Sequence, residues 1–263
     1  GIVFPQNKLN KKSAKKLGDN YKLNDGVFQI NNNELNELCL DKNELSLIKP
    51  FYTSTELSRF YGNENNKEWV IYTESDIKNT INLYPNIKTH LDNFSEIITS
   101  DNQPYGLHRS RNERFFQGEK IFSLRKNIIP QFTYTNFDCY VSQTFYSIKT
   151  DRFNLQYLTV ILNSKLIAFW LRYKGKMQGS NYQIDKEPLL NIPLKMPNTI
   201  IQNTFMLLAN KIIADKKNED DTIALERQVD VMVCKLYELT YAEVLIVDEE
   251  FAMSEVEYNN FEL

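Results

Sequence analysis

The scarcity of glycine is the feature that most restricts what this sequence can fold into. The chain has only 8 glycines in 263 residues, and no two of them complete a G-x-G-x-x-G or G-x-x-x-x-G-K pattern. Such patterns form the tight turns whose backbone amides hold nucleotide phosphates. With 2 histidines, 3 cysteines and no C-x-x-C spacing, the ligands of a closed zinc site are missing as well. We therefore expect no catalytic residues, no cofactor and no metal site in this chain.

The first 150 residues alternate short apolar runs with polar clusters, which predicts a region of mixed strands and helices. The polar, lysine-rich first 20 residues and the lack of an initiating methionine predict a linker or the cut end of a longer protein. The spacing of Leu35, Leu38 and Leu45, with Leu47 and Ile48, predicts a helix within residues 27–48. Proline at position 50 ends it, because proline disfavours helix in the residue before it. The other expected elements are a helix within 84–94 and strands at 69–72, 120–124, 132–134 and 140–148.

After residue 150 the apolar spacing becomes helical. Residues 155–173 are apolar on most sides and predict one largely buried helix. Two further stripes, within 199–215 and 222–238, predict helices that pack as an antiparallel pair. Thr240 and Glu243 have the spacing of a capping box that opens a last short helix. The sequence thus predicts an α+β fold with a mixed, mostly antiparallel sheet and a C-terminal helical region.

Charge is distributed unevenly along the chain. Residues 219–263 carry 13 acidic and 2 basic side chains, whereas the first 218 residues have a balance of +8. A basic body with an acidic end favours a polyanion-binding body, although acidic ends also simply keep proteins soluble. No apolar run approaches the ~18 residues of a membrane span. The three widely spaced cysteines fit buried thiols in a reducing compartment, so we expect a cytoplasmic protein without membrane contact.

The segment 105–126 is the most informative, because it carries six basic and two acidic side chains. Arginine presents a planar fork of donors that matches phosphate oxygens and the edge of guanine. The interleaved aromatic side chains can anchor the segment or stack on bases. A solvated loop beside a strand is the alternative explanation. The candidate DNA-binding residues are His108, Arg109, Arg111, Arg114, Lys120, Arg125 and Lys126.

A second basic segment, 172–182, has no acidic side chain and contains Gly175 and Gly179. Backbone exposed at glycines and flanked by cations suits contact with a phosphate backbone. The alternative is an ordinary helix C-terminus, where glycine caps the last turn and cations offset the helix dipole. The candidate DNA-binding residues here are Lys174, Lys176, Gln178, Ser180 and Asn181.

The order of several segments is more specific than any one of them. They are EWVIYT at 68–73, YPNIKTHLDNF at 84–94, YGLHRSR at 105–111, GEKIFSLRK at 118–126, CYVSQTFYSIK at 139–149, LQYLTVILNSKLIAFWLR at 155–172 and LLNIPL at 189–194. As an ordered set they resemble the TaqI-like C-terminal specificity domain. That family provides target recognition in adenine-N6 DNA methyltransferases and in fused restriction-modification enzymes.

The resemblance implies a non-catalytic module that binds double-stranded DNA and reads bases, mainly through the major groove. It implies that a methyltransferase core in the same parent chain binds S-adenosylmethionine and flips the adenine. Three regions follow: 1–50 as a linker and connecting segment from the missing core, 51–198 as the target-recognition domain, and 199–263 as a C-terminal helical region. The helices would serve as a scaffold and pack against the core.

Two other classes of protein remain compatible with the sequence. A specificity subunit of a multisubunit restriction system would use its helical part mainly to dock protein partners, and a duplicated recognition domain would favour it. The sequence contains one such domain. A small metal-dependent nuclease would be revealed by plasmid cleavage that substitution of one carboxylate abolishes.

Overall fold

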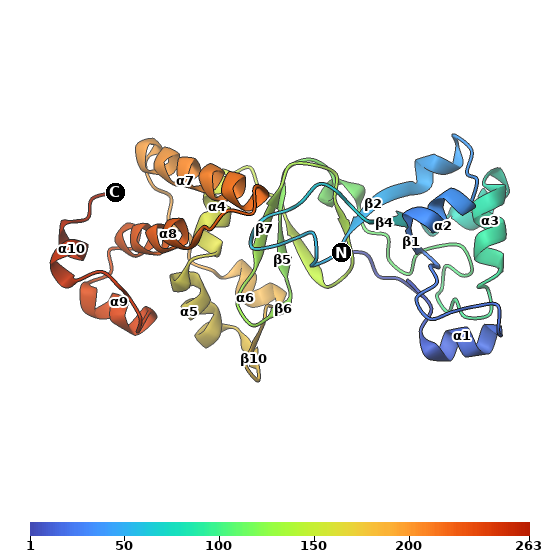
Figure 1. Cartoon of the computed structure of the whole chain (residues 1–263), viewed down its shortest axis with the longest axis horizontal. Helices are drawn as coiled ribbons and strands as arrows, with labels where there is room; N and C mark the ends of the chain where they lie inside the picture. Colours follow the sequence, from blue (N-terminus) through green and yellow to red (C-terminus); the bar gives the residue numbers. More distant parts are fainter. The chain divides into compact units, whose positions relative to one another are not determined.

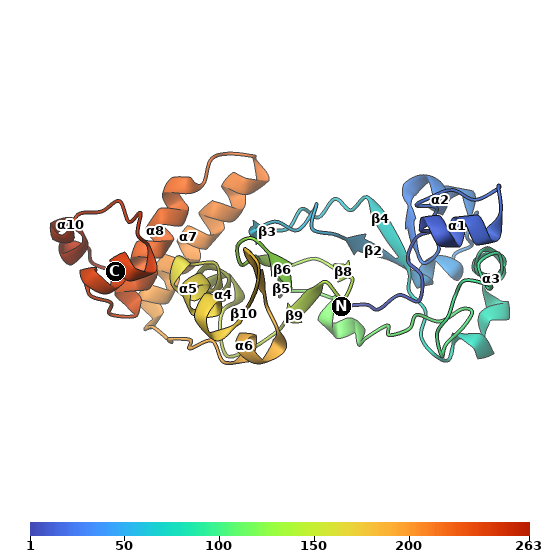
Figure 2. The ribbon, with the colours of Figure 1, turned by 90° about the horizontal axis from the view of Figure 1, so that it is seen from below.

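A computed structural model describes all residues, 1–263, and divides them into two compact units (Figure 1, Figure 2). Unit 1 comprises Gly1–Glu56, Glu64–Gly118 and Phe137–Phe145, and unit 2 comprises Leu57–Asn63, Glu119–Asn136 and Tyr146–Leu263. Each unit is discontinuous in sequence, because the chain passes between them several times. The three regions expected from the sequence divide the chain by function, and that division stays a prediction.

Unit 1 is built on a four-stranded sheet with the order β1 (Gln29–Asn31), β4 (Glu68–Ile71), β2 (Ile48–Tyr52) and β8 (Tyr140–Val141). Strand β4 pairs antiparallel with both β1 and β2, whereas β8 runs parallel to β2. The apolar side chains of these strands are buried and form the core of the unit. The remaining elements are α1 (Lys11–Leu17), α2 (Asn32–Glu37), α3 (Pro85–Asp92) and the 3-10 turns η1 (Glu44–Leu47), η2 (Ile77–Asn79), η3 (Ile81–Leu83) and η4 (Glu113–Phe115).

Unit 2 contains two sheets. One has the order β3 (Phe60–Tyr61), β7 (Phe132–Thr135), β5 (Lys120–Leu124) and β9 (Phe145–Ile148), and the other has the order β10 (Lys176–Gln178), β11 (Asn181–Gln183) and β6 (Lys126–Asn127). The core lies where α4 (Leu155–Leu162) packs against β7 and α7 (Thr199–Lys217). The other helices are α5 (Lys165–Lys174), α6 (Lys186–Leu190), α8 (Ile223–Leu236), α9 (Tyr241–Val247) and α10 (Glu255–Asn260).

The single helix expected at 155–173 is wrong, because the chain forms α4 and α5 with a break at Asn163 and Ser164. The Asn163 side chain accepts a hydrogen bond from the Phe132 backbone N–H (3.0 Å) and donates one to the Phe132 carbonyl (2.7 Å). Ser164 caps the second helix by accepting from the Ile167 N–H. A buried amide that bonds to strand β7 therefore replaces helix continuity at this point.

Two other expectations are corrected. The helix expected within 27–48 is reduced to α2 and the turn η1, because Cys39 adopts a left-handed φ of 50° between them. The strand expected at 140–148 splits into β8 and β9, each belonging to a different sheet. The lysine-rich beginning forms α1 with a cap in which Asn10 Oδ1 accepts from the Ser13 N–H (2.9 Å), and its expected role as a linker stays a prediction.

The predicted fold class is confirmed, because the chain mixes helices with sheets whose pairings are mostly antiparallel. Helices α7 and α8 pack against each other across the short connection between them (Figure 2). Thr240 and Glu243 form the predicted capping box of α9. The expectation of three buried thiols is wrong for Cys39, which is exposed. None of the helices combines the length and apolar character that crossing a bilayer requires.

Candidate nucleic-acid interface

The first candidate surface lies in unit 1, on irregular backbone that leads into the turn η4. His108, Arg109, Arg111 and Arg114 are all exposed there. We call these four residues the arginine segment. Their backbone is held by contacts from three separate parts of unit 1, which are described in turn.

The end of strand β4 fixes one side of the arginine segment. The buried hydroxyl of Tyr72 donates to the Arg111 carbonyl (2.6 Å), and the Thr73 hydroxyl donates to the Tyr105 carbonyl (2.7 Å). The Leu107 N–H in turn donates to the Thr73 carbonyl (3.3 Å). Burial raises the pKa of Tyr72 to about 12, so its hydroxyl remains a donor at neutral pH.

The first residues of the chain fix the other side. Val3 and Arg109 exchange two backbone hydrogen bonds, of 3.0 and 3.1 Å, in an antiparallel bridge. The Arg111 Nε donates to the Gly1 carbonyl (3.1 Å). The arginine segment thus lies between the N-terminal residues and the end of β4, which restricts its backbone without covering its side chains.

Arg111 has a left-handed backbone conformation, with a φ of 76°. Residues other than glycine adopt this conformation rarely, and it persists where surrounding contacts determine it. The hydrogen bonds from Tyr72 and to Gly1 supply those contacts. Immediately after it, the Asn112 side chain accepts from the Arg114 N–H (3.0 Å) and begins η4.

The far end of the arginine segment is attached to the sheet of unit 1 through Glu113. Its carboxylate accepts a hydrogen bond from the Tyr140 hydroxyl and lies 3.4 Å from Lys49 Nζ. The ring of Phe116 stacks on that of Tyr140, with centroids 4.8 Å apart. Burial raises the pKa of Tyr140, and the hydrogen bond that its hydroxyl donates to the Glu113 carboxylate raises it further. Glu113 is therefore a positioning residue for the neighbouring Arg114.

The second candidate surface lies in unit 2 on the three-stranded sheet. Lys176 pairs with Gln183, and Gln183 pairs with Lys126. Since directly opposed residues of antiparallel strands have side chains on the same face, the two lysines flank Gln183 on one face of the sheet. The structure thus brings together two segments that are about 50 residues apart in sequence. We call Arg125, Lys126, Lys174, Lys176, Gln178, Ser180 and Asn181 the basic hairpin surface.

The hairpin of β10 and β11 projects from the body of unit 2 (Figure 1). The buried Ile184, whose N–H donates to the Arg125 carbonyl (2.8 Å), anchors its base. Arg125 is half-buried, with its guanidinium 4.9 Å from the centre of the Tyr146 ring and 3.8 Å from Asp185. These contacts leave Lys126, Lys174, Lys176, Gln178 and Ser180 as the exposed members of the surface, while Asn181 is half-buried.

Glycine occupies two positions of this hairpin, and the structural reason differs between them. Gly175 ends α5, and a Cβ atom there would lie 2.4 Å from the Leu171 carbonyl oxygen. Gly179 forms the turn with a left-handed φ of 62°, and a Cβ atom there would meet open space. Gly175 is therefore explained by the helix end that it caps, which was the alternative considered from the sequence.

Lys120 is a correction to the predicted contacts. Its side chain is fully buried in β5, with the ammonium 5.6 Å from the centre of the Phe122 ring. A side chain enclosed in the core of unit 2 does not reach a ligand at the surface, so we remove Lys120 from the candidate interface. A single sequence does not show whether a charged residue within an apolar strand is buried or exposed.

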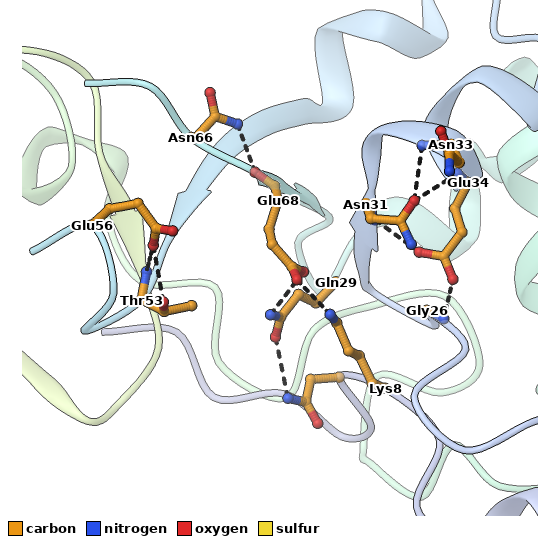
Figure 3. A network of polar contacts seen from close by, with 11 residues as sticks. Lys8, Gly26, Gln29, Asn31, Asn33, Glu34, Thr53, Glu56, Asn66 and Glu68 are labelled. Carbon is orange, nitrogen blue, oxygen red and sulfur yellow. Dashed lines mark hydrogen bonds and ion pairs between the residues drawn. The ribbon is translucent and has the colours of Figure 1, made fainter. Parts of the chain in front are cut away.

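The carboxylates of unit 1 hold backbone and side chains in place. Figure 3 shows Glu68 paired with Lys8 (2.6 Å) and accepting from Gln29 (3.0 Å), which ties the N-terminal segment to the sheet. Glu34 accepts from the Gly26 and Asn31 backbone N–H groups, both at 2.7 Å. No group of three or more His, Cys, Asp or Glu side chains in the chain is arranged to hold a metal ion.

A cavity of about 390 Å³ lies in unit 2 beside α8 and the segment after α9. Lys165 and Asp248 form an ion pair of 2.6 Å in its wall. Asp230, also in the wall, is buried and accepts from the Lys165 backbone N–H (2.7 Å). Burial raises the pKa of Asp230 to about 6, against the lowering effect of that hydrogen bond. The cavity mixes both charges and contains no nucleophile with an adjacent base.

Sequence reasoning missed the residues that position the arginine segment. Tyr72 lies in the apolar run at 69–72, which predicts only a core strand, and Val3 lies in a segment expected to be a linker. Contacts between residues so far apart in sequence leave no local signal. Glu113 was counted only as a negative charge among the arginines.

Comparisons with known proteins agree with this architecture. Residues 49–194 match the family described as the TaqI-like C-terminal specificity domain. The Type II methyltransferase M.HincII of Haemophilus influenzae is 24% identical over 239 residues, which cover 84% of this chain and 44% of that protein. The Type II methyltransferase M.HindII of Haemophilus influenzae (strain ATCC 51907 / DSM 11121 / KW20 / Rd) is 27% identical over 109 residues, covering 41% and 18%.

A solved structure shares the fold. The Type IIL restriction-modification enzyme MmeI, in complex with DNA, superposes with a TM-score of 0.63 at 14% identity, covering 86% of this chain and 33% of that one. The chain spans less than half the length of each of these proteins. Because the family match covers more than half of the 263 residues, the chain belongs to the TaqI-like C-terminal specificity domain family.

Proposed function

We propose that this chain is the DNA target-recognition module of a restriction-modification adenine-N6 DNA methyltransferase and is not catalytic by itself. Family membership and the similarity to two Type II methyltransferases support this proposal. The ligand is double-stranded DNA. Arg109, Arg111 and Arg114, with His108, contact it from unit 1, and the basic hairpin surface contacts it from unit 2.

The observation that carries the proposal is the fixed backbone of the arginine segment. Four exposed side chains, three of them arginines, are attached to a backbone held by Tyr72 and Val3, and the Arg111 side chain is itself held by the Gly1 carbonyl. The Tyr72 hydroxyl on the Arg111 carbonyl and the backbone bridge between Val3 and Arg109 keep this loop in one conformation. Holding the backbone before binding lowers the ordering cost that a flexible basic loop has on contact with DNA.

The chemistry of methyl transfer belongs to the methyltransferase core of the parent chain. That core would bind S-adenosylmethionine, for which this chain offers neither a glycine-containing motif nor an Asn-Pro-Pro-aromatic motif. Residues 51–198 form the recognition domain in this proposal, residues 1–50 connect it to the core, and residues 199–263 pack against the core. The strongly acidic charge of the last region suits a protein partner better than DNA. We place the protein in the cytoplasm.

Selection from a random-sequence duplex library tests the proposal. The 263-residue chain is incubated with the library, and the bound duplexes are separated and sequenced over several rounds. Because the side chains that contact bases are positioned before binding, we expect enrichment of one defined sequence. The variant R109A/R111A/R114A should lose this enrichment.

A matched control removes three positive charges elsewhere in unit 1. Lys11, Lys12 and Lys15 are exposed on α1, so the variant K11A/K12A/K15A has the same net charge as the arginine variant. It should enrich the same sequence as the unmodified chain. Retained duplexes with no enriched sequence, or equal loss in both variants, would contradict the proposal.

A further inference from the structure

Two adjacent isoleucines in unit 2 are exposed beside the basic hairpin surface. Ile128 and Ile129, directly after β6, expose 66% and 53% of their surface. Their loop is closed by a hydrogen bond from the Asn127 side chain to that of Gln131 (3.0 Å), and the Ile128 N–H donates to Asn127 Oδ1 (2.9 Å). Gln131 is itself buried and donates to the Leu57 carbonyl. The loop therefore holds two branched apolar side chains outward on a fixed base.

The strand register places this loop beside the tip of the hairpin. Lys126 stands opposite Gln183, and Asn127 stands opposite Tyr182, so the chain after Asn127 continues toward Asn181 and the turn at Gly179. The end of the sheet thus combines the two isoleucines with Gln178, Ser180 and Asn181. Two register steps behind this end, Lys126 and Lys176 share a face of the sheet.

This arrangement has the charge of a polyanion-binding surface rather than that of a protein-docking patch. Lys126, Lys174 and Lys176 are exposed around it, and Asp185, which follows β11, already faces Arg125 at 3.8 Å. The tip of the β10–β11 hairpin extends beyond the last pairing of β6 at Tyr182 and is therefore two-stranded. A two-stranded ribbon fits the major groove of B-DNA, where the cations reach phosphates and the tip reaches base edges. The 5-methyl group of thymine is the apolar feature of that groove.

We propose that Ile128 and Ile129 determine part of the sequence specificity by contacting thymine methyl groups in the major groove. The inference rests on the proposed function. It adds thymine as a recognised base, and two contacting residues that lie outside the basic segments. The lysines of the basic hairpin surface bind the phosphate backbone of the DNA and so hold the sheet in the groove. The two isoleucines bury their exposed surface against the thymine edge.

Replacing thymine by deoxyuridine tests the contact without changing the protein. Affinity is measured by fluorescence anisotropy for the sequence selected by the chain and for versions in which each thymine in turn is deoxyuridine. Burying one methyl group contributes a factor of about four to affinity. We expect a loss of about fourfold at one or two positions for the unmodified chain, and no further loss at those positions for I128A/I129A.

The matched control is I200A/L207A on α7, whose side chains are 78% and 71% exposed in the same unit. This control variant should show the same loss of affinity, about fourfold, as the unmodified chain when thymine is replaced by deoxyuridine. Equal affinity of the unmodified chain for thymine and deoxyuridine at every position would overturn the inference while leaving the proposed function intact. Unchanged DNA binding by I128A/I129A together with lost binding to the separately expressed methyltransferase core would also overturn it, in favour of a protein contact. No enrichment in the selection would refute the proposed function and the inference together.

Discussion

The hydroxyl of Tyr72 donates a 2.6 Å hydrogen bond to the carbonyl of Arg111. This bond joins the residue that directly follows the core strand β4 to the one arginine of the segment with a left-handed backbone. The side chain of Arg111 stays exposed, and its Nε donates to the Gly1 carbonyl, so both the backbone and the guanidinium of this residue are positioned. The stability of unit 1 and the geometry of the candidate interface are coupled at this point.

Replacing Tyr72 by Phe removes that bond and leaves the buried ring in place. We expect the free energy of unfolding to fall by about 1 kcal/mol, as for other single hydrogen bonds. Because Arg111 loses a contact that holds its backbone, DNA affinity should fall several-fold. Urea unfolding and fluorescence anisotropy measure the two effects, with Tyr84→Phe as a control at a half-buried tyrosine outside the segment. Lower stability with unchanged affinity would show that the bond does not position Arg111.

Glu44 provides a pH-dependent contribution to the stability of unit 1. Its buried carboxylate accepts from the backbone N–H groups of Asp41, Asn86 and Ile87 and so caps the start of α3. Burial acts to raise the pKa of Glu44, but these hydrogen bonds together lower it below its ordinary 4.5. The contribution is therefore full above pH 4.5 and is lost as the pH falls through the lowered value.

Glu44→Gln should lower the free energy of unfolding by about 2 kcal/mol at pH 7, because an amide group then faces backbone donors. The difference from the unmodified chain should shrink toward pH 3. Urea unfolding at several pH values measures it, and the exposed Glu37→Gln serves as the control. A difference that stays constant between pH 7 and pH 3 would contradict the assignment.

Asp230 changes the free energy of unfolding with pH in the direction opposite to Glu44. Because burial raises its pKa from 3.8 to about 6, the folded chain binds a proton more tightly than the unfolded chain. The free energy of unfolding should therefore fall as the pH rises from 4 to 6, by at most about 3 kcal/mol from this group. Asp230→Asn retains an oxygen acceptor for the Lys165 N–H and should remove this part of the pH dependence, whereas the exposed Asp220→Asn should not. Parallel pH profiles for the unmodified chain and Asp230→Asn would refute the prediction.

Local patterns in the sequence predicted the elements that depend on local causes. The spacing of Ile87 and Leu91 after Pro85 gives α3, and the capping box of Thr240 and Glu243 gives α9. The break between α4 and α5 was not predictable, because it depends on Asn163 bonding to Phe132, 31 residues away. The sequence also could not show that Lys120 is buried, since its exposure is decided by the neighbours of β5 in the sheet.

In the candidate interface, too, local features were predictable from the sequence and features that depend on distant residues were not. Its exposed cations were identifiable from charge and aromatic spacing, and most of them lie at the surface. The pairing of Lys126 and Lys176 with Gln183 required the strand register, and the attachment of Arg109 to Val3 required the tertiary fold. The position of Ile128 and Ile129 at the end of this sheet also follows from the strand register and could not be predicted from the sequence.

The salt dependence of duplex binding tests the central claim most directly. Phosphate contacts release counterions, so the logarithm of the association constant falls with the logarithm of salt concentration by about 0.9 per contact. Anisotropy titrations of one selected duplex at 50 to 200 mM salt compare the chain, R109A/R111A/R114A and K11A/K12A/K15A. We predict that the arginine variant loses about 1 to 2 from the magnitude of the slope, because at least one of the three arginines contacts bases rather than phosphates, and that the lysine variant keeps the slope of the unmodified chain. The same slope for all three proteins would contradict the assignment of the arginine segment to DNA.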